Sequence, residues 1–402
     1  NESFLDTAIE LPNVQRIAKQ MGFKQPGAAT STGICNFYIL IPASSTSGGP
    51  DTSYIPILKR GSLVGSQSGA VYTLTQDVDF TAPNNEITVA RVDSDTGVPT
   101  FFAIKGQGTV VSGRLYEEEI SVTNYERFLR LGLAASGVSE IIAVVDSQGN
   151  EYFQVDYLTQ DVIISKEPNR GTNRDLVPFI MKTKPCPRRF VTEFDTNGNA
   201  FLQFGYGSAD NLTGDLIANP ADVVLDVTGR TYVSDPTFDP TNLIKTDKFG
   251  VVPENTTLTV VYRGNTASTI NSAASTVNEV VESNLTFTNR AALTDDAANA
   301  VIDSLEVENP EPILGDTSQL TAEEIKTRAY ASFASQNRAV TRTDYISLSY
   351  RMPNGFGKVK RVNIIQDPRS TRRNLNLYVL AENVNGKFAA PTTQLKTNLK
   401  SW

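Results

Sequence analysis

The chain has 402 residues, of which 40% are hydrophobic and 20% charged, with a net charge of −8. This length allows two or three domains with buried cores, and no apolar run approaches the roughly 18 residues of a membrane-crossing helix. The absence of histidine excludes the Ser-His-Asp and Cys-His mechanisms and the H-E-x-x-H zinc site. The two cysteines, Cys35 and Cys186, form no disulfide framework, so we expect buried thiols. We expect no metal, no cofactor and no enzymatic role, although a carboxylate pair or a lysine or tyrosine with a shifted pKa stays open.

The first 25 residues predict a helical segment. Val14, Ile17, Ala18 and Met21 recur at helical spacing, and Gly22 follows as a C-cap. This stripe either packs on its own domain or joins a bundle that contacts other chains. The sequence starts without an initiator Met or a signal peptide and ends within an apolar helical pattern. We therefore expect both ends to be cut from a longer polypeptide.

Residues 26–120 are predicted to form a β-rich domain. Residues 87–92 alternate between two faces, and short apolar runs lie between Gly, Pro, Asn and Asp clusters. The glycines of residues 61–69 lack the Gly-Lys-Ser/Thr ending of a phosphate loop, so we expect a hairpin loop. Residues 93–97 do not have the spacing of a calcium loop and indicate a turn.

Residues 121–263 are predicted to form a second β-rich domain. It opens with a short helix over residues 121–136, followed by a hairpin over residues 141–155. Residues 208–250 are rich in Thr, Asp and Pro and indicate an exposed insertion. The Ser, Thr, Ala and Asn content of residues 264–310 then predicts a long, poorly packed linker.

Residues 311–402 are predicted to form a basic α/β domain, truncated at its C-terminus. Thr321 and Glu324 have capping-box spacing ahead of a helix, and a second short helix is expected near Asp344. Two strands and a last helix opening near Thr392 follow, a pattern similar to a split β-α-β unit. The chain as a whole therefore predicts an α+β, multi-domain protein.

Charge is divided unevenly along the chain. Residues 326–402 hold 14 basic and 3 acidic side chains, a net charge of +11, which leaves −19 on the rest. No nucleic-acid-binding motif frames the basic residues, so we favour an acidic surface of a neighbouring subunit over nucleic acid. The cluster around the predicted strands comprises Lys358, Lys360, Arg361, Arg369, Arg372 and Arg373.

Three segments, in this order, resemble the baseplate J-like family of contractile phage tails, and most closely the ring-forming wedge subunits of T4-like phages. The third is the most specific, an Arg-Ala-Val-Thr followed by Asp-Tyr. The segments are Val14-Gln-Arg-Ile17-Ala18-Lys-Gln-Met21-Gly22-Phe23 with Gly27-Ala28-Ala29-Thr30; Phe204-Gly205-Tyr206-Gly207 with Val252-Pro253-Glu254 and Thr257-Leu258-Thr259-Val260-Val261-Tyr262-Arg263; and Arg328-Ala329-Tyr330 with Asn337-Arg338-Ala339-Val340-Thr341-Arg342-Thr343-Asp344-Tyr345. The long insertion before Pro253 departs from the family pattern.

The resemblance implies a scaffold without catalytic residues. Such subunits pair as homodimers, contribute helices to a bundle with a second wedge protein, and close as six wedges into a ring around the central hub. The ring relays the trigger to sheath contraction, so the resemblance also implies hub or sheath-proximal partners and a place in the virion after assembly in the host cytoplasm. A β-rich carbohydrate-active or cell-surface protein that uses a carboxylate pair is the alternative, although a single Trp argues against sugar stacking.

Three candidate subunit interfaces follow from these patterns. They are the N-terminal apolar stripe, the basic hairpin and the last helix. The candidate residues are Val14, Ile17, Met21, Lys358, Lys360, Arg361, Arg372, Arg373, Leu395, Leu399 and Trp402.

Overall fold

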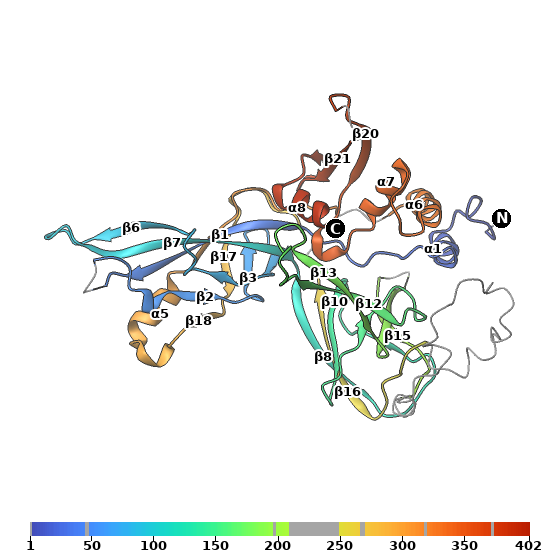
Figure 1. Ribbon diagram of the computed structural model, residues 1–402, viewed down its shortest axis with the longest axis horizontal. Helices are drawn as coiled ribbons and strands as arrows, with labels where there is room; N and C mark the ends of the chain where they lie inside the picture. The colour runs from blue at the N-terminus through green and yellow to red at the C-terminus, as the bar shows by residue number, and fades with distance from the viewer. Residues whose placement is uncertain are drawn as a thin grey trace. The chain divides into compact units, whose positions relative to one another are not determined.

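The structure, a computed structural model, describes residues 2–44, 48–195, 198–208, 249–265, 270–316, 320–370 and 374–402. Strand predominates, at 40% against 17% helix, so the predicted α+β, multi-domain class is confirmed. The chain divides into two compact units (Figure 1). Unit 1 combines Asn1–Leu115 with Arg263–Trp402, and unit 2 is Tyr116–Tyr262. Unit 2 is therefore inserted in the sequence of unit 1, a division that differs from the five segments expected from the sequence.

The largest sheet of unit 1 is antiparallel between all neighbouring strands. Its order is β17-β3-β4-β7-β1-β19, and β6 also pairs with β7. Because β7 has 14 residues, it pairs with β4 near one end and with β6 near the other. The strands are β1 (Thr32–Pro42), β3 (Leu63–Ser66), β4 (Val71–Leu74), β6 (Glu86–Val92), β7 (Pro99–Ser112), β17 (Val277–Glu282) and β19 (Glu306–Glu308).

A smaller antiparallel sheet, β18-β2-β5, completes this part of unit 1. It consists of β2 (Pro56–Leu58), β5 (Val78–Asp79) and β18 (Leu285–Phe287). Two glycines of β7 let the small sheet approach the large one. A Cβ at Gly106 would lie 2.5 Å from Cγ1 of Val78, and one at Gly108 would lie 2.7 Å from Cγ2 of the same residue. Any larger side chain at these positions would therefore separate the two sheets.

The main core of unit 1 lies against alternate residues of β1. Phe37, Ile39 and Ile41 are fully buried, because a strand points every second side chain to the same face. Burial of each such side chain stabilises the fold by about 1.5–3 kcal/mol. Val301 of α5 (Asp295–Asp303) packs in the same cluster.

The predicted linker over residues 264–310 is wrong. This segment supplies β17, β18, α5 and β19, and Val277 is fully buried in the main core. Its buried polar residues are bonded internally: Asn309 Oδ1 accepts from the backbone N–H groups of Thr276 and Val277, and its Nδ2 donates to Ala273 O. Many of its polar residues are exposed, but those that are buried have hydrogen-bond partners, so a polar composition does not exclude a place in the packed fold.

Two helices of unit 1 begin at capping boxes. The Thr321 capping box is confirmed at α6 (Ala322–Ser335), and a second one, from Thr341 and Asp344, starts α7 (Arg342–Tyr350). The N-terminal helix is confirmed as α1 (Leu11–Gln20). Three short 3-10 helices are η1 (Thr52–Tyr54), η3 (Arg290–Ala292) and η4 (Asn354–Phe356).

The C-terminal part of unit 1 contains the two predicted strands and the predicted last helix. β20 (Arg361–Gln366), β21 (Leu375–Glu382) and β22 (Phe388–Ala389) form an antiparallel meander, and α8 (Thr393–Ser401) follows with Thr392 as its N-cap. No β-α-β crossover occurs in the described part of this segment. The sheet packs its inner face on a small cluster that includes Met352, Val359 and Leu395.

The described residues of unit 2 form three sheets. Their strand orders are β10-β16-β8, β11-β14-β15-β9 and β12-β13. The first two share a core that includes Val138, Phe190, Leu202 and Phe204. The strands are β8 (Arg114–Val122), β9 (Arg130–Gly132), β10 (Val138–Asp146), β11 (Phe153–Gln154), β12 (Val162–Pro168), β13 (Phe179–Pro185), β14 (Arg189–Phe194), β15 (Ala200–Phe204) and β16 (Thr256–Gly264).

Two expectations for unit 2 need correction or refinement. The helix predicted over residues 121–136 is wrong: Leu129 and Leu133 are buried around the short strand β9, which pairs with β15. The turn after β10 is confirmed, with Asp146 Oδ1 accepting from the N–H groups of Gln148 and Asn150, but β11 then pairs in parallel with β14. Most of the predicted insertion, residues 209–248, lies outside the described residues.

Candidate functional site

The N-terminal stripe is covered by its own chain. Val14 is fully buried, and Ile17 and Met21 pack with it against Ile325 and Ala329 of α6. The helix therefore packs on its own domain, and Val14 is not accessible to a partner, while a contact of the partly buried Ile17 and Met21 with another chain stays a prediction. The spacing correctly predicts an apolar helix face, but spacing alone does not indicate which element covers such a face.

The C-terminal stripe is covered in part. Leu395 is fully buried and so is not accessible to a partner, whereas Leu399 packs beside it and is only partly buried. Trp402 keeps 53% of its surface exposed, and its Nε1 donates to Leu348 O at 3.4 Å. Trp402 is the more exposed of the two residues of this predicted set that remain candidate contacts.

Most of the described basic hairpin is engaged within unit 1. Lys358 Nζ donates to Gly27 O at 3.2 Å, and burial lowers the pKa of Lys358 to about 8 although Asp316 favours its charge. Lys360 Nζ lies 3.1 Å from Asp316 and 2.8 Å from Glu382. Burial opposes the charge of Lys360, but hydrogen bonds to these two carboxylates outweigh it and raise its pKa. The prediction that Lys358 and Lys360 dock a partner is therefore wrong.

Arg361 and Arg369 are the exposed described members of the predicted cluster, and Arg361 has an ion-pair partner. Its side chain is 47% exposed, and its guanidinium lies 3.1 Å from Glu324. Arg372 and Arg373 lie outside the described residues. The net charge of residues 326–402 overstated the free basic surface, because Asp316 and Glu324 precede this window and neutralise part of it.

The most specific family-like segment builds the turn between α6 and α7. Gln336 and Asn337 both have positive φ, of 48° and 61°, which ends α6 and reverses the chain. Thr341 accepts from the Asp344 N–H, and the Asp344 carboxylate accepts from Thr341 N at 2.8 Å. The Thr341 N–H lowers the pKa of Asp344, although burial opposes this. The segment therefore has a structural role in joining two helices.

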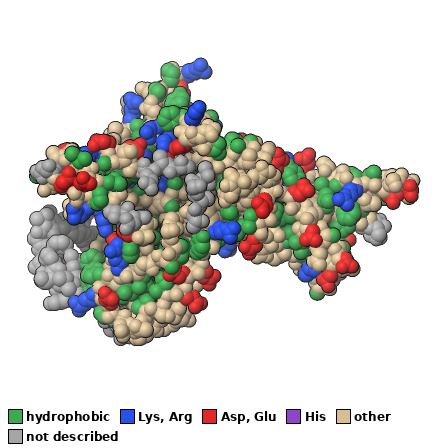
Figure 2. Space-filling view, turned by 180° about the vertical axis from the view of Figure 1, so that it is seen from behind, with side chains coloured by type: hydrophobic (Ala, Val, Ile, Leu, Met, Phe, Trp, Pro, Cys, Tyr) green, Lys and Arg blue, Asp and Glu red, His purple; other side chains and the backbone are tan. Residues whose placement is uncertain are grey.

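Apolar strand surfaces are the largest feature that the sequence analysis missed. The outward face of β20 and β21 exposes Ile365, Tyr378 and Leu380 by 46%, 55% and 41%. Figure 2 shows hydrophobic and basic side chains at the surface of this hairpin. In unit 2 the β12–β13 hairpin exposes still more apolar side chains. The sequence could not reveal this exposure, because an apolar strand face has the same alternating pattern whether or not another element covers it.

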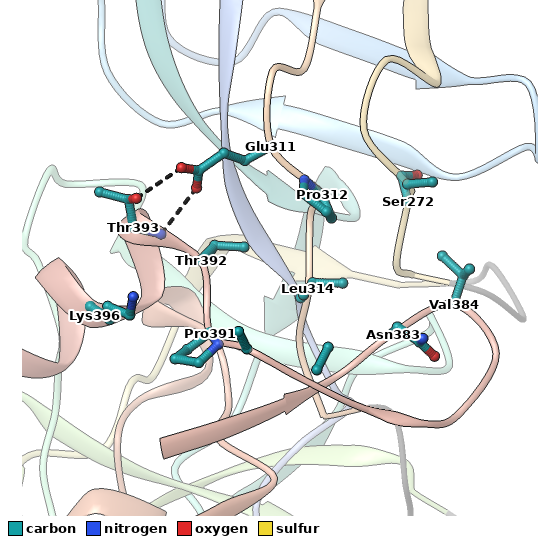
Figure 3. Close-up of a pocket in the computed structure, with 13 residues that line it drawn as sticks. Ser272, Glu311, Pro312, Leu314, Asn383, Val384, Pro391, Thr392, Thr393 and Lys396 are labelled. Atoms are coloured by element: carbon teal, nitrogen blue, oxygen red, sulfur yellow. Dashed lines mark hydrogen bonds between the residues drawn. The ribbon is translucent and has the colours of Figure 1, made fainter. Parts of the chain in front are cut away.

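A pocket of about 550 Å³ lies in unit 1 beside the start of α8 (Figure 3). The Glu311 carboxylate accepts from Thr393 N at 3.1 Å and from Thr393 Oγ1 at 2.9 Å, so it caps the helix N-terminus. Pro312 and Leu314 line it with Pro391 and other small apolar side chains. Glu311 is thus engaged as a cap, and the rest of the pocket is lined mainly by small and apolar side chains.

The described residues contain no group of three or more Cys, Asp or Glu placed to hold a metal ion. Burial raises the pKa of the Cys35 thiol to about 12, which keeps it protonated and unreactive. Among the helices that the structure describes, none is both long enough and apolar enough to cross a membrane. Neither a comparison with protein-family models nor one with curated protein sequences finds a match to this chain.

Proposed function

We propose that this chain is a structural subunit of a contractile phage tail baseplate. It forms part of the wedge and of the inner ring that joins the wedges around the hub, and it relays the trigger to sheath contraction. Its place would be the virion, and its partners would be other wedge subunits, a second copy of itself, and hub or sheath-proximal proteins.

The observation that carries the proposal is the apolar surface left open on strand hairpins of both units. Ile164 and Met181 of unit 2 are 71% and 67% exposed, and Tyr378 of unit 1 is 55% exposed. Contiguous exposed apolar surface is typical of proteins that bury it against partners. The family resemblance then narrows the kind of assembly, and the structural role of residues 336–344 agrees with a scaffold.

The carbohydrate-active alternative receives no comparable support. A general acid requires a carboxyl group whose pKa is raised. Hydrogen bonds from backbone N–H groups lower the carboxyl pKa at Glu2, Asp77, Asp93 and Asp344, which is the direction opposite to that of a general acid. Hydrolysis of bacterial surface polysaccharide by the purified protein would reverse this preference.

The test is the light-scattering mass of the full-length protein, alone and mixed with candidate wedge proteins. We expect a mass above that of the monomer alone, and a larger stoichiometric complex in at least one mixture. Each candidate partner is measured alone as the control. A protein that stays monomeric in every mixture would overturn the proposal.

A further inference from the structure

The β12–β13 hairpin of unit 2 carries its apolar residues on the face that is open to solvent. In the described residues these two strands pair only with each other (Figure 1). Their register places Ile164, Met181 and Phe179 on one face, and these side chains are 71%, 67% and 44% exposed. A two-stranded sheet alone is marginally stable in water. The hairpin therefore has both a free strand edge and an uncovered apolar face to offer.

The opposite face of the hairpin is mixed, with two lysines beside Glu167 and the 43% exposed Ile180. Lys182 and Lys184 lie two residues apart on β13, so their side chains point to the same side. Residues 161–185 carry a net charge of +2, whereas the other described residues of unit 2 carry −7. Repulsion between basic hairpins disfavours contact of one hairpin with another, and the acidic remainder of unit 2 has the complementary charge.

β8 is the acidic edge strand of the β10-β16-β8 sheet. Glu117 and Glu119 are exposed and lie two residues apart on one face. On the other face Ile120 packs on the unit 2 core and Val122 is buried in it. Glu118 also points to that side, where it accepts from the hydroxyl of Tyr262 at 3.0 Å. At its free edge, β8 therefore presents carboxylates on one face and mainly apolar side chains on the other.

We propose that β13 of one molecule adds to the free edge of β8 in a second copy of this chain. In an antiparallel register Glu117 lies opposite Lys184 and Glu119 opposite Lys182, at the matching spacing of two residues. The same register places Met181 opposite Ile120, so that the exposed apolar face of the hairpin continues the apolar face of β8. This pairing therefore brings opposite charges together on one face of the joined sheet and apolar side chains together on the other.

The free strand edge of the hairpin and its charge match with β8 favour a protein edge over a lipid surface. Apolar residues lie along both strands, and the turn between them contains Arg170 and Arg174 as well as Leu176, which is 87% exposed. Lys182 already pairs with Glu167 at 2.6 Å, but the two side chains are 60% and 47% exposed. Exposed pairs of this kind contribute little, so Lys182 can turn to a new carboxylate at small cost. The inference rests on the proposed function only in requiring that the chain assembles with copies of itself.

The test exchanges the charges on the two strands in the full-length protein. Light-scattering mass is measured against concentration for the natural chain, for Glu117→Lys with Glu119→Lys, and for Lys182→Glu with Lys184→Glu. We expect each double variant to need an about tenfold or greater increase in concentration to associate. An equimolar mixture of the two, or one chain with all four changes, should recover association. Glu126→Lys with Glu151→Lys, two exposed positions off β8, controls for net charge.

A covalent link tests the register. Oxidation of a chain with Glu119→Cys and Lys182→Cys should give linked oligomers, while Glu119→Cys with Lys184→Cys should give few. Circular dichroism and the melting temperature show whether each variant folds.

Association unchanged in both charge-swapped variants, or lost without recovery on mixing, would overturn this contact and leave the assembly proposal standing. Binding of the natural chain to anionic vesicles, abolished by Lys182→Glu with Lys184→Glu while the mass stays monomeric, would assign the hairpin to a lipid surface and overturn the contact. A chain that is monomeric alone and in every mixture would remove both proposals.

Discussion

Lys360 and Glu382 form a buried ion pair in which Nζ lies 2.8 Å from Oε2, with the side chains 14% and 9% exposed. Asp316 holds the same ammonium group at 3.1 Å and is 5% exposed. The pairing joins β21 to residues that precede α6, so it fixes the C-terminal meander to the rest of unit 1.

We expect Lys360→Met to lower the free energy of unfolding of unit 1 by about 3–5 kcal/mol, because two buried carboxylates lose their cation. Urea denaturation at pH 7 measures the change. Lys105→Met, which breaks the exposed pair with Glu86, should cost less than about 1 kcal/mol. Equal small effects of the two substitutions would show that the Lys360 pairs do not hold in solution.

Lys358 should make stability rise with pH. Burial lowers its folded pKa to about 8, while the unfolded value is about 10.4, so the unfolded chain binds more protons between these values. The cost of burying the charge is present below pH 8 and is relieved as the pH rises toward 10. We expect the natural protein to gain about 1–3 kcal/mol relative to Lys358→Met over this interval.

Urea denaturation of both proteins at pH 7, 8, 9 and 10 measures this difference. Lys387→Met, at an exposed position, is the control. Parallel pH dependences for the natural protein and Lys358→Met would contradict the lowered pKa.

The turn between α6 and α7 should depend on the hydroxyl of Thr341. Thr341→Ala removes the acceptor for the Asp344 N–H, and we expect a loss of about 1 kcal/mol. Thr341→Ser keeps the acceptor and should change the unfolding free energy by only a few tenths of a kcal/mol. A loss as large for Ser as for Ala would mean that the methyl group matters and the cap does not.

The last helix should respond very differently at its two apolar positions. Leu395→Ala leaves a cavity among fully buried neighbours and should cost about 2–5 kcal/mol. Trp402→Ala, at a half-exposed position, should cost less than about 1 kcal/mol. If Trp402→Ala reduces the light-scattering mass without reducing stability, Trp402 is a subunit contact. If neither the mass nor the stability changes, the prediction that Trp402 contacts another subunit is wrong.

The local elements of unit 1 were predictable where one segment contains its own signal. Thr321 with Glu324 marks a capping box whatever the tertiary context, and the apolar stripe around Val14 requires a covered helix face. What covers the stripe could not be predicted, because α6 lies about 300 residues away in sequence. The same limit explains why Lys360 was assigned to a docking surface although Asp316 and Glu382 surround it.

The composition of residues 264–310 and 121–136 led to two wrong predictions, a linker and a helix. Asn309 makes the first segment look exposed, yet its amide is fully bonded in the core. In the second, Leu129, Leu131 and Leu133 fit a strand period as well as a loose helical one, and pairing of β9 with β15 decides between them. Burial and partner identity are long-range properties, and these are what a single sequence lacks.

The insertion of unit 2 within unit 1 sets the order in which the chain becomes able to fold during translation. Unit 2 is continuous in sequence, so it is complete once residue 262 has been made. The edge of β3 must wait for β17, which lies more than 200 residues later, and at about 5–20 residues per second this delay is roughly 10–40 s. During that interval the nascent sheet exposes an unpaired edge. We therefore expect ribosome-bound chains of this protein to depend on chaperones until β17 and β19 emerge.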